Sequence, residues 1–263
     1  MRFLKPLLDF YINSSIHVGL ALFSLTYVTT FSNDLCRHIT YPCCVLFGTI
    51  LGYNFLKYFE LFRKGNFHKP KYYAIVIVSL LAIPGYLFFY LRMINEIKIQ
   101  LVIAGFMVML YPFLRKYGIL KMFWVSFVIA YLTAFLFINE LPGFEGSIVL
   151  EFLRRFVFVS ALMIPFEIYD SQHDDKILNT LPQKLGVANA KKVGYLLVML
   201  FLFLEVVNFN GIFKFQYFVI AIVIAILVAM AIRFSTTERN RYYTSFWVES
   251  IPILWWILLV LFQ

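Results

Sequence analysis

Three carboxylates beside an apolar stretch carry the clearest chemical signal in the sequence. Glu167, Asp170 and Asp174 stand at spacings of three and four residues, directly after the apolar run 156–166. On a helix this spacing places the three side chains on one face, within roughly 60° of each other. Magnesium ions bind to a few such carboxylates and complete their coordination with water and substrate phosphate. The pattern therefore predicts a magnesium site for diphosphate chemistry at a membrane surface.

A solvated acidic helix end, with Lys176 and Lys184 as counter-ions, is the alternative interpretation of this stretch. It fits Glu167 and Asp170 less well, because both lie directly against the apolar run. A charge at that depth is costly and usually functional.

A second polar group could complete a diphosphate site. Arg115 and Lys116 follow Pro112, which interrupts a regular helix and could turn both side chains toward a cavity. Arginine contacts phosphate with two parallel hydrogen bonds, and lysine acts as a point charge. The alternative is that both residues anchor the end of a membrane helix.

A third polar group interrupts another apolar stretch. Asn54, Lys57 and Tyr58 have the i, i+3, i+4 spacing that places them on one helical face. Alternatively, Lys57 extends its ammonium to the membrane interface and Tyr58 belongs to the aromatic belt. Glu249 could also face a cavity.

The composition indicates which elements must position these residues. Hydrophobic residues make up 62% of the 263 positions and charged residues 14%, whereas an ordinary soluble domain is about 25% charged. We therefore expect an all-α polytopic membrane protein, with residues 1–263 forming one domain. Nine stretches are long enough to cross a bilayer, which takes about 20 residues. They are 10–30, 39–61, 72–92, 97–114, 119–138, 149–171, 192–209, 213–233 and 243–262.

The basic residues predict the orientation of these helices. Most of the 23 Lys and Arg residues fall in segments that share a side with the N-terminus. Because cytoplasmic loops are enriched in these residues, the N-terminus is expected inside and the C-terminus outside. This places the carboxylates on the cytoplasmic face of the cell membrane. Lipid contacts explain the net charge of +9 without nucleic acid as a partner.

Together these features resemble the UbiA superfamily of intramembrane prenyltransferases, the group of 4-hydroxybenzoate polyprenyltransferase. Its members have nine transmembrane helices around a central cavity. Asp-rich motifs on the second and sixth helices hold Mg²⁺ and the diphosphate of an isoprenoid donor. Two segments carry the resemblance: Glu167-x-x-Asp170-x-x-x-Asp174 with the downstream Thr180-Leu181-Pro182 and Leu185-Gly186, and Tyr111-Pro112 followed by Arg115-Lys116.

The first family motif, Asn-Asp-x-x-Asp-x-x-x-Asp, is altered in this chain. With Asn54 as the anchor, Phe55, Tyr58 and Phe62 occupy the acidic positions. Lys57 lies one turn from Asn54. Our hypothesis is that its ammonium replaces some of the charge that a missing Mg²⁺ would supply.

The resemblance implies transfer of an isoprenyl group from an isoprenoid diphosphate to an aromatic or lipid acceptor, with Mg²⁺ as cofactor. The alternative is a protein of this fold that binds an isoprenoid or quinone lipid without turnover, or serves as a membrane scaffold; a transporter is a weaker third. Combined with the Lys57 hypothesis, the resemblance predicts these roles: Asp170, Asp174 and Lys57 catalytic; Glu167, Asp170 and Asp174 for metal; Asn54, Lys57, Arg115 and Lys116 for the diphosphate.

Overall fold

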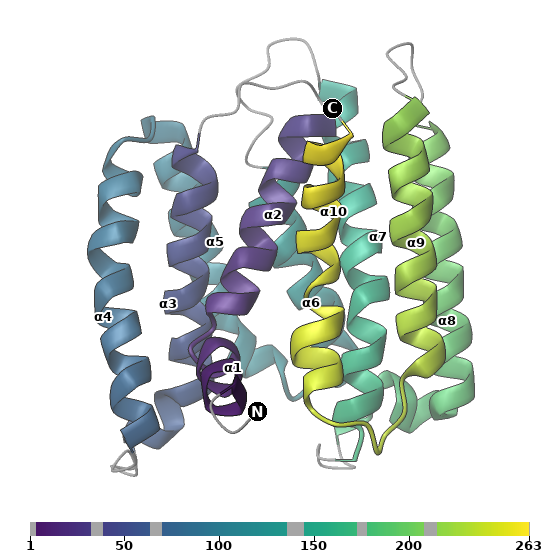
Figure 1. Cartoon of the computed structure of the whole chain (residues 1–263), viewed down its shortest axis with the longest axis horizontal. Helices are drawn as coiled ribbons and strands as arrows, with labels where there is room; N and C mark the ends of the chain where they lie inside the picture. Colours follow the sequence, from purple (N-terminus) through teal and green to yellow (C-terminus); the bar gives the residue numbers. More distant parts are fainter. Residues whose placement is uncertain are drawn as a thin grey trace.

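The described part of the chain is an upright bundle of helices. The computed structural model describes residues 4–32, 39–63, 70–135, 145–172, 178–207 and 215–262, and these form helices joined by short turns. The two termini lie at opposite ends of the bundle (Figure 1). The helices are α1 (Leu4–Asn13), α2 (Ile16–Ser32), α3 (Thr40–Arg63), α4 (Pro70–Leu91), α5 (Asn95–Leu114), α6 (Ile119–Ala130), α7 (Glu145–Asp170), α8 (Leu181–Val207), α9 (Phe215–Phe234) and α10 (Ile251–Leu261), with π-helical turns η1 (Tyr131–Phe135) and η4 (Tyr243–Val248).

Length and composition mark this bundle as a polytopic membrane protein. Four described helices are long and apolar enough to cross a bilayer, and the bent pair α1–α2 would add a fifth. The four are Tyr72–Leu91, Asn95–Leu114, Phe215–Phe234 and Tyr243–Leu261. Helices α3, α7 and α8 have 24 or more residues but carry more polar side chains. The expectation of nine crossings, like that of their orientation, stays a prediction.

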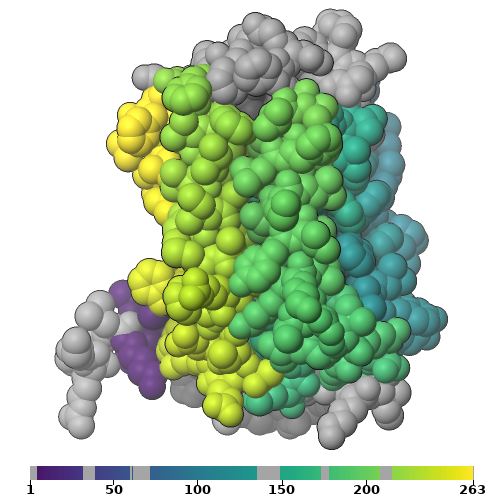
Figure 2. Space-filling view, turned by 90° about the vertical axis from the view of Figure 1, so that its right-hand side faces the viewer, coloured from purple at the N-terminus to yellow at the C-terminus, as the bar shows by residue number. Residues whose placement is uncertain are grey.

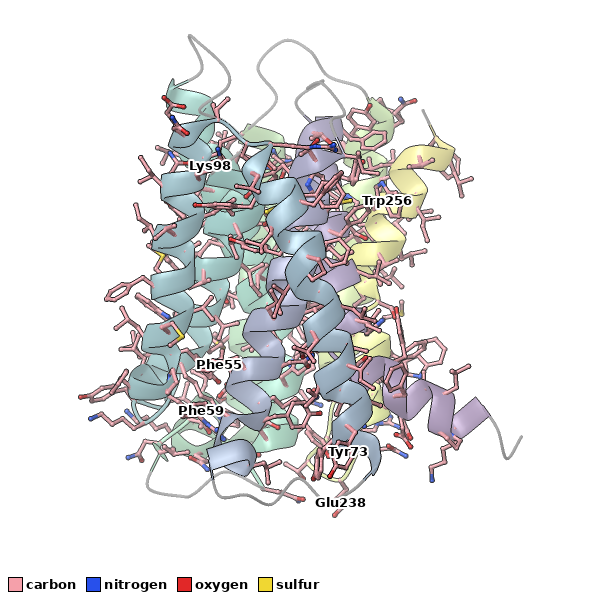
Figure 3. All side chains as sticks on the ribbon, turned by 90° about the vertical axis from the view of Figure 1, so that its left-hand side faces the viewer. Phe55, Phe59, Tyr73, Lys98, Glu238 and Trp256 are labelled. Atoms are coloured by element: carbon pink, nitrogen blue, oxygen red, sulfur yellow. The ribbon has the colours of Figure 1, made fainter. Side chains whose placement is uncertain are left out.

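Large apolar side chains cover the outside of the bundle. Leu81, Phe106 and Met199 are each 67% exposed, and the face formed by α8 and α9 has similar side chains (Figure 2). Lys98 lies near one end of the bundle and Glu238 at the other (Figure 3). Such an apolar surface is unfavourable in water but matches the hydrocarbon core of a bilayer.

The helices close into a ring. Helix α2 packs on α3 and α10, α5 packs on α6, and α7 packs on α6 and α8. Helix α9 joins α8 to α10. This arrangement leaves the inner faces of α2, α3, α5, α6 and α7 directed at a common interior, where a site can form.

Two predicted membrane stretches differ in detail from the structure. The stretch 10–30 is not one helix, because α1 and α2 meet at a 60° bend where Ser15 has a φ of +61°. The stretch 119–138 changes after Ala130 into the π-helical turn η1. Hydropathy alone did not reveal either change, because both occur inside continuous apolar sequence.

A buried cluster of charges ties α7 to its neighbours. The Arg154 guanidinium donates to both carboxylate oxygens of Glu205 on α8, at 3.0 and 2.6 Å, and to Glu151. Arg155 donates to the Thr29 hydroxyl of α2 at 2.9 Å. Two arginines and two glutamates thus form a set that is neutral as a whole, as charges in a membrane interior require.

The turn before α6 depends on a glycine. Gly118 has a φ of +40°, and a Cβ at this position would lie 2.1 Å from the Leu178 carbonyl oxygen. The backbone of this turn therefore packs directly against the segment that leads into α8.

We predict that Gly118→Ala lowers the free energy of unfolding by roughly 1–3 kcal/mol. The alanine would have to adopt a left-handed backbone conformation, and its Cβ would clash with the neighbouring carbonyl oxygen. The thermal unfolding midpoint in detergent measures the effect. Gly105→Ala is the matched control, since a Cβ there meets nothing within 4 Å. Equal midpoints for the two variants would contradict the prediction.

Candidate functional site

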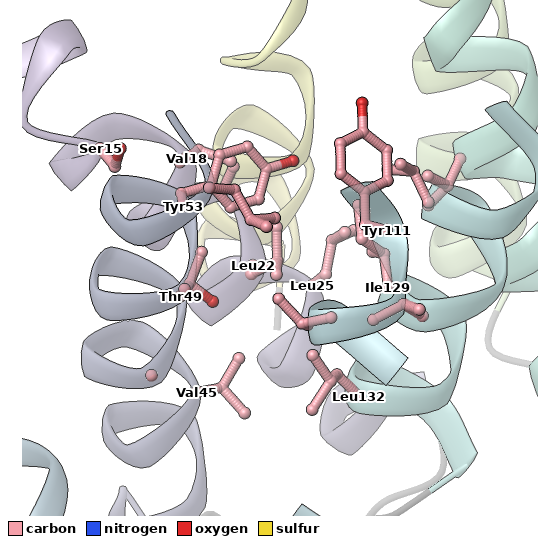
Figure 4. Close-up of a pocket in the computed structure, with 18 of the residues that line it drawn as sticks. Ser15, Val18, Leu22, Leu25, Val45, Thr49, Tyr53, Tyr111, Ile129 and Leu132 are labelled. Atoms are coloured by element: carbon pink, nitrogen blue, oxygen red, sulfur yellow. The ribbon is translucent and has the colours of Figure 1, made fainter. Parts of the chain in front are cut away.

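An apolar cavity lies inside the ring of helices. Its volume is about 620 Å³, and side chains of α2, α3, α5, α6 and α7 form most of its wall. Figure 4 shows Tyr53 and Tyr111 at one end of this space and Val45 and Leu132 at the other. A long apolar ligand would be shielded from water along most of its length here.

A second, more polar cavity of about 430 Å³ adjoins the first. We call this space the mouth. Lys57, Phe166, Asp170, Ser245 and Glu249 line both spaces, so these side chains mark the place where the apolar cavity opens into the polar one. A charged residue predicted from the sequence can contact a ligand at this junction only if its side chain lines one of the two spaces.

Of the three predicted metal ligands, Asp170 reaches the junction. It lies at the end of α7, half-buried, and lines both cavities. Glu167 is 2% exposed and its Oε1 lies 3.4 Å from the Nζ of Lys121 on α6, so its carboxylate ties two helices together. Asp174 lies outside the described residues. Among the residues that the structure describes, no three His, Cys, Asp or Glu side chains form a metal-binding group.

Some of the predicted basic residues line a cavity and one does not. Lys57 lines both cavities, and its ammonium lies 5.5 Å from the centre of the Tyr58 ring. Arg115 lines the apolar cavity. Lys116 is exposed, lies over the ring of Tyr117, and is outside the lining of both spaces. Of the predicted basic residues, Lys57 therefore lies at the junction, and Arg115 lines the apolar cavity alone.

Asn54, which the sequence predicted as a diphosphate-binding residue, forms buried hydrogen bonds between helices. Its Oδ1 accepts a hydrogen bond from the Ser15 hydroxyl at 2.8 Å. Its Nδ2 donates to the Ser14 carbonyl at 3.1 Å and to the Ser79 hydroxyl at 2.9 Å. Asn54 lines neither cavity. Its amide instead binds the bend between α1 and α2 to α3 and α4.

Sequence reasoning missed Arg241 and left Glu249 open. Arg241 stands just before η4 and lines the mouth with Glu249. Its guanidinium donates to the Asn13 side chain, and the neighbouring Tyr242 hydroxyl donates to Asp9 at 2.6 Å. That hydrogen bond raises the pKa of Tyr242. Arg241 resembled an ordinary cytoplasmic loop residue, and only the folded chain brings it to the mouth.

The described helices therefore enclose an apolar cavity that opens into a smaller space lined by charged side chains of both signs. The fold agrees with that of solved structures. A UbiA homologue from Archaeoglobus fulgidus, solved with bound GPP and Mg²⁺, aligns with a TM-score of 0.62 and 14% identity over 96% of this chain and 98% of that one. A second structure of a UbiA homologue from this organism gives a TM-score of 0.61 with the same identity and coverage.

A structure from work on digeranylgeranylglyceryl phosphate synthase in membranes aligns with a TM-score of 0.60 and 19% identity, over 100% of this chain and 98% of that one. The sequence matches no protein-family model and no curated protein. The chain therefore has the UbiA fold, as its motifs predicted, and at these identities the likeness establishes the fold alone.

We predict that Asn54→Ala lowers the free energy of unfolding by roughly 1–3 kcal/mol, because buried hydrogen-bonding groups lose their partner. Thermal unfolding in detergent, with pyrophosphate binding measured in parallel, checks this. Asn189→Ala is the control, since Asn189 is exposed and bonds only within its own helix. A loss of pyrophosphate affinity with unchanged stability would instead make Asn54 a ligand-binding residue.

Proposed function

We propose that the chain is an integral-membrane prenyltransferase that moves an isoprenyl group from an isoprenoid diphosphate to an aromatic or lipid acceptor. The observation that carries this proposal is the junction of the two cavities. There, Asp170 and Lys57 line the opening of an apolar space of about 620 Å³, whose wall also includes Arg115. The UbiA fold, seen with GPP and Mg²⁺ in one solved homologue, supports the same interpretation.

The donor would lie with its tail in the apolar cavity and its diphosphate in the mouth. Arg115 and Lys57 would bind the diphosphate, Arg115 through paired hydrogen bonds and Lys57 as a point charge. In the reaction, the bond between the isoprenyl carbon and the diphosphate oxygen breaks, and both electrons leave with the diphosphate. The acceptor supplies the electron pair of the new bond and releases a proton.

The wall of the apolar cavity suits the cation that forms when this bond breaks. Tyr53, Tyr111, Trp124 and Phe166 all line the space. The faces of aromatic rings attract cations, and the apolar lining keeps out the water that would otherwise capture the cation. These side chains would therefore guide the isoprenyl group to the acceptor.

Mg²⁺ is the cofactor of this proposal, on the α7 side of the mouth, where Asp170 is a described carboxylate. Asp170 would hold the ion together with Asp174, as the resemblance implies. When bound there, Mg²⁺ supplies positive charge that stabilises the departing diphosphate. Glu167, held by Lys121, would fix the end of α7, so we do not assign it to the metal.

We also propose nine crossings in a single domain, with the N-terminus and the mouth on the cytoplasmic side of the cell membrane. The termini lie at opposite ends of the bundle (Figure 1), as an odd number of crossings requires. Basic side chains are concentrated at the mouth end, as expected for a cytoplasmic face. Those among the described residues include Lys5, Lys57, Arg115, Lys116, Lys121, Lys184, Lys191, Lys192, Arg233, Arg239 and Arg241.

A second candidate function is binding of an isoprenoid or quinone lipid without turnover. One observation favours it: none of the described α3 side chains that line the two cavities is a carboxylate. A site that holds the donor without ionising it would have this composition.

We predict that the purified protein in lipid nanodiscs releases diphosphate from geranyl, farnesyl or geranylgeranyl diphosphate in the presence of Mg²⁺ and a cell-derived lipid extract as acceptor source. Asp170→Asn should reduce the rate by roughly 10²-fold, because electrostatic stabilisation of the leaving group is lost. Glu96→Gln, at the far end of α5, is the control. Tight donor binding without release would favour the second candidate, and release unaffected by Asp170→Asn would overturn the proposed site.

A further inference from the structure

The mouth has a cationic side that the metal chemistry does not explain. Asp170 comes from α7, but α3 contributes Lys57 and the segment before η4 contributes Arg241. A metal ion cannot bind between an ammonium and a guanidinium, because neither group has a lone pair to offer. On this side the residues do not fit Mg²⁺.

Arg241 is held in place by α1. Its guanidinium donates to the Asn13 side chain, and the Tyr58 hydroxyl of α3 donates to the Asn13 carbonyl at 2.8 Å. Lys57 stands next to Tyr58 with its ammonium near that ring. The two cations thus share one support, although they lie 184 positions apart in the sequence (241 minus 57).

Glu249 provides the negative charge that lets both cations stay close. It lines the mouth with them and lies within electrostatic range of each. Neither its carboxylate nor the Lys57 ammonium forms a hydrogen bond or close ion pair with another side chain in the described part of the chain. The three charges are therefore near one another without being locked together, which leaves them able to bind an incoming anion.

The charge balance of the two cavities supports the same conclusion. The described charged residues that line them are Lys57, Arg115 and Arg241 on the positive side and Asp170 and Glu249 on the negative side. This set carries a surplus of one positive charge. In the mouth itself Lys57 and Arg241 balance Asp170 and Glu249, and Arg115 in the adjoining apolar cavity adds one positive charge. These described residues therefore lack the net negative charge that would repel a diphosphate until metal ions neutralised it.

We propose that Lys57 and Arg241 form a diphosphate subsite that works without a metal ion, with Glu249 as the counter-ion that keeps the two cations together before the anion binds. This inference rests on the proposed function and makes it more specific: the donor is bound by protein cations on the α3 side and needs metal only on the α7 side.

Binding of inorganic pyrophosphate and of geranyl S-thiolodiphosphate, a slowly reacting donor analogue, tests the subsite. Isothermal titration of the protein in nanodiscs is carried out in EDTA and in Mg²⁺. We expect binding in EDTA, within about tenfold of the affinity in Mg²⁺. Lys57→Gln and Arg241→Gln should each weaken binding in EDTA roughly tenfold or more, since each removes a charged hydrogen-bond donor.

Lys98→Gln and Arg92→Gln are matched controls, because they remove the same charges near the far end of the bundle and should change nothing. No binding of wild type in EDTA, or binding by both mouth variants equal to that of the controls, would overturn the subsite. A Glu249→Gln variant separates the roles of the carboxylate. If Glu249 is a counter-ion, Glu249→Gln should leave the increase in affinity on adding Mg²⁺ unchanged. If that increase disappears in the variant, Glu249 is a metal ligand and its assignment as counter-ion is wrong.

These outcomes are independent of turnover, because no acceptor is present and no product is measured. Metal-free binding by a protein that never transfers an isoprenyl group would refute the proposed function and leave the subsite intact. Turnover by a protein that shows no metal-free binding would refute the subsite and leave the proposed function intact.

Discussion

A charge inside a membrane bundle must be neutralised by another charge or by a dense set of hydrogen bonds, because the surrounding hydrocarbon offers neither. Much of this structure follows from that constraint. Arg154 is neutralised by Glu205 and Glu151, and Glu167 by Lys121. Asn54 meets the same requirement with three hydrogen bonds. In each case the polar group joins two or more helices, so neutralising it also fixes their arrangement.

The charges at the mouth follow a different rule. Asp170, Lys57 and Glu249 line the open space that the two cavities share. The protein therefore separates polar groups that hold the bundle together from polar groups that remain available to a ligand. This distinction, more than residue type, identifies the site: Glu167 and Asp170 are three positions apart on one helix, yet one is used for packing and the other faces the cavity.

The sequence predicted the helical class, the UbiA fold and the approach of Asp170, Arg115 and Lys57 to a common space. Hydropathy and helical spacing, which are local properties, predicted the helical class and the shared faces, and the resemblance to the family motifs implied the fold. It did not predict the direction in which each face points. Arg115 and Lys116 are adjacent in the sequence, yet Arg115 lines the apolar cavity and Lys116 lines neither space. Asn54 and Lys57 are only about 60° apart on one helical face, yet Lys57 lines both cavities and Asn54 neither. Arg241 could not be predicted either, because a loop residue reaches the mouth only through the folding of distant helices.

The neutral charge cluster near the start of α7 affects how the chain enters the membrane. Helix α7 by itself contains Glu151, Arg154 and Arg155 in that region, which leaves one positive charge unbalanced, and Glu205 on α8 supplies the missing negative charge. A helix released alone into lipid would have to carry this charge unneutralised. Helices α7 and α8 are therefore expected to leave the insertion machinery together, as an antiparallel pair whose arginines and glutamates have already formed ion pairs.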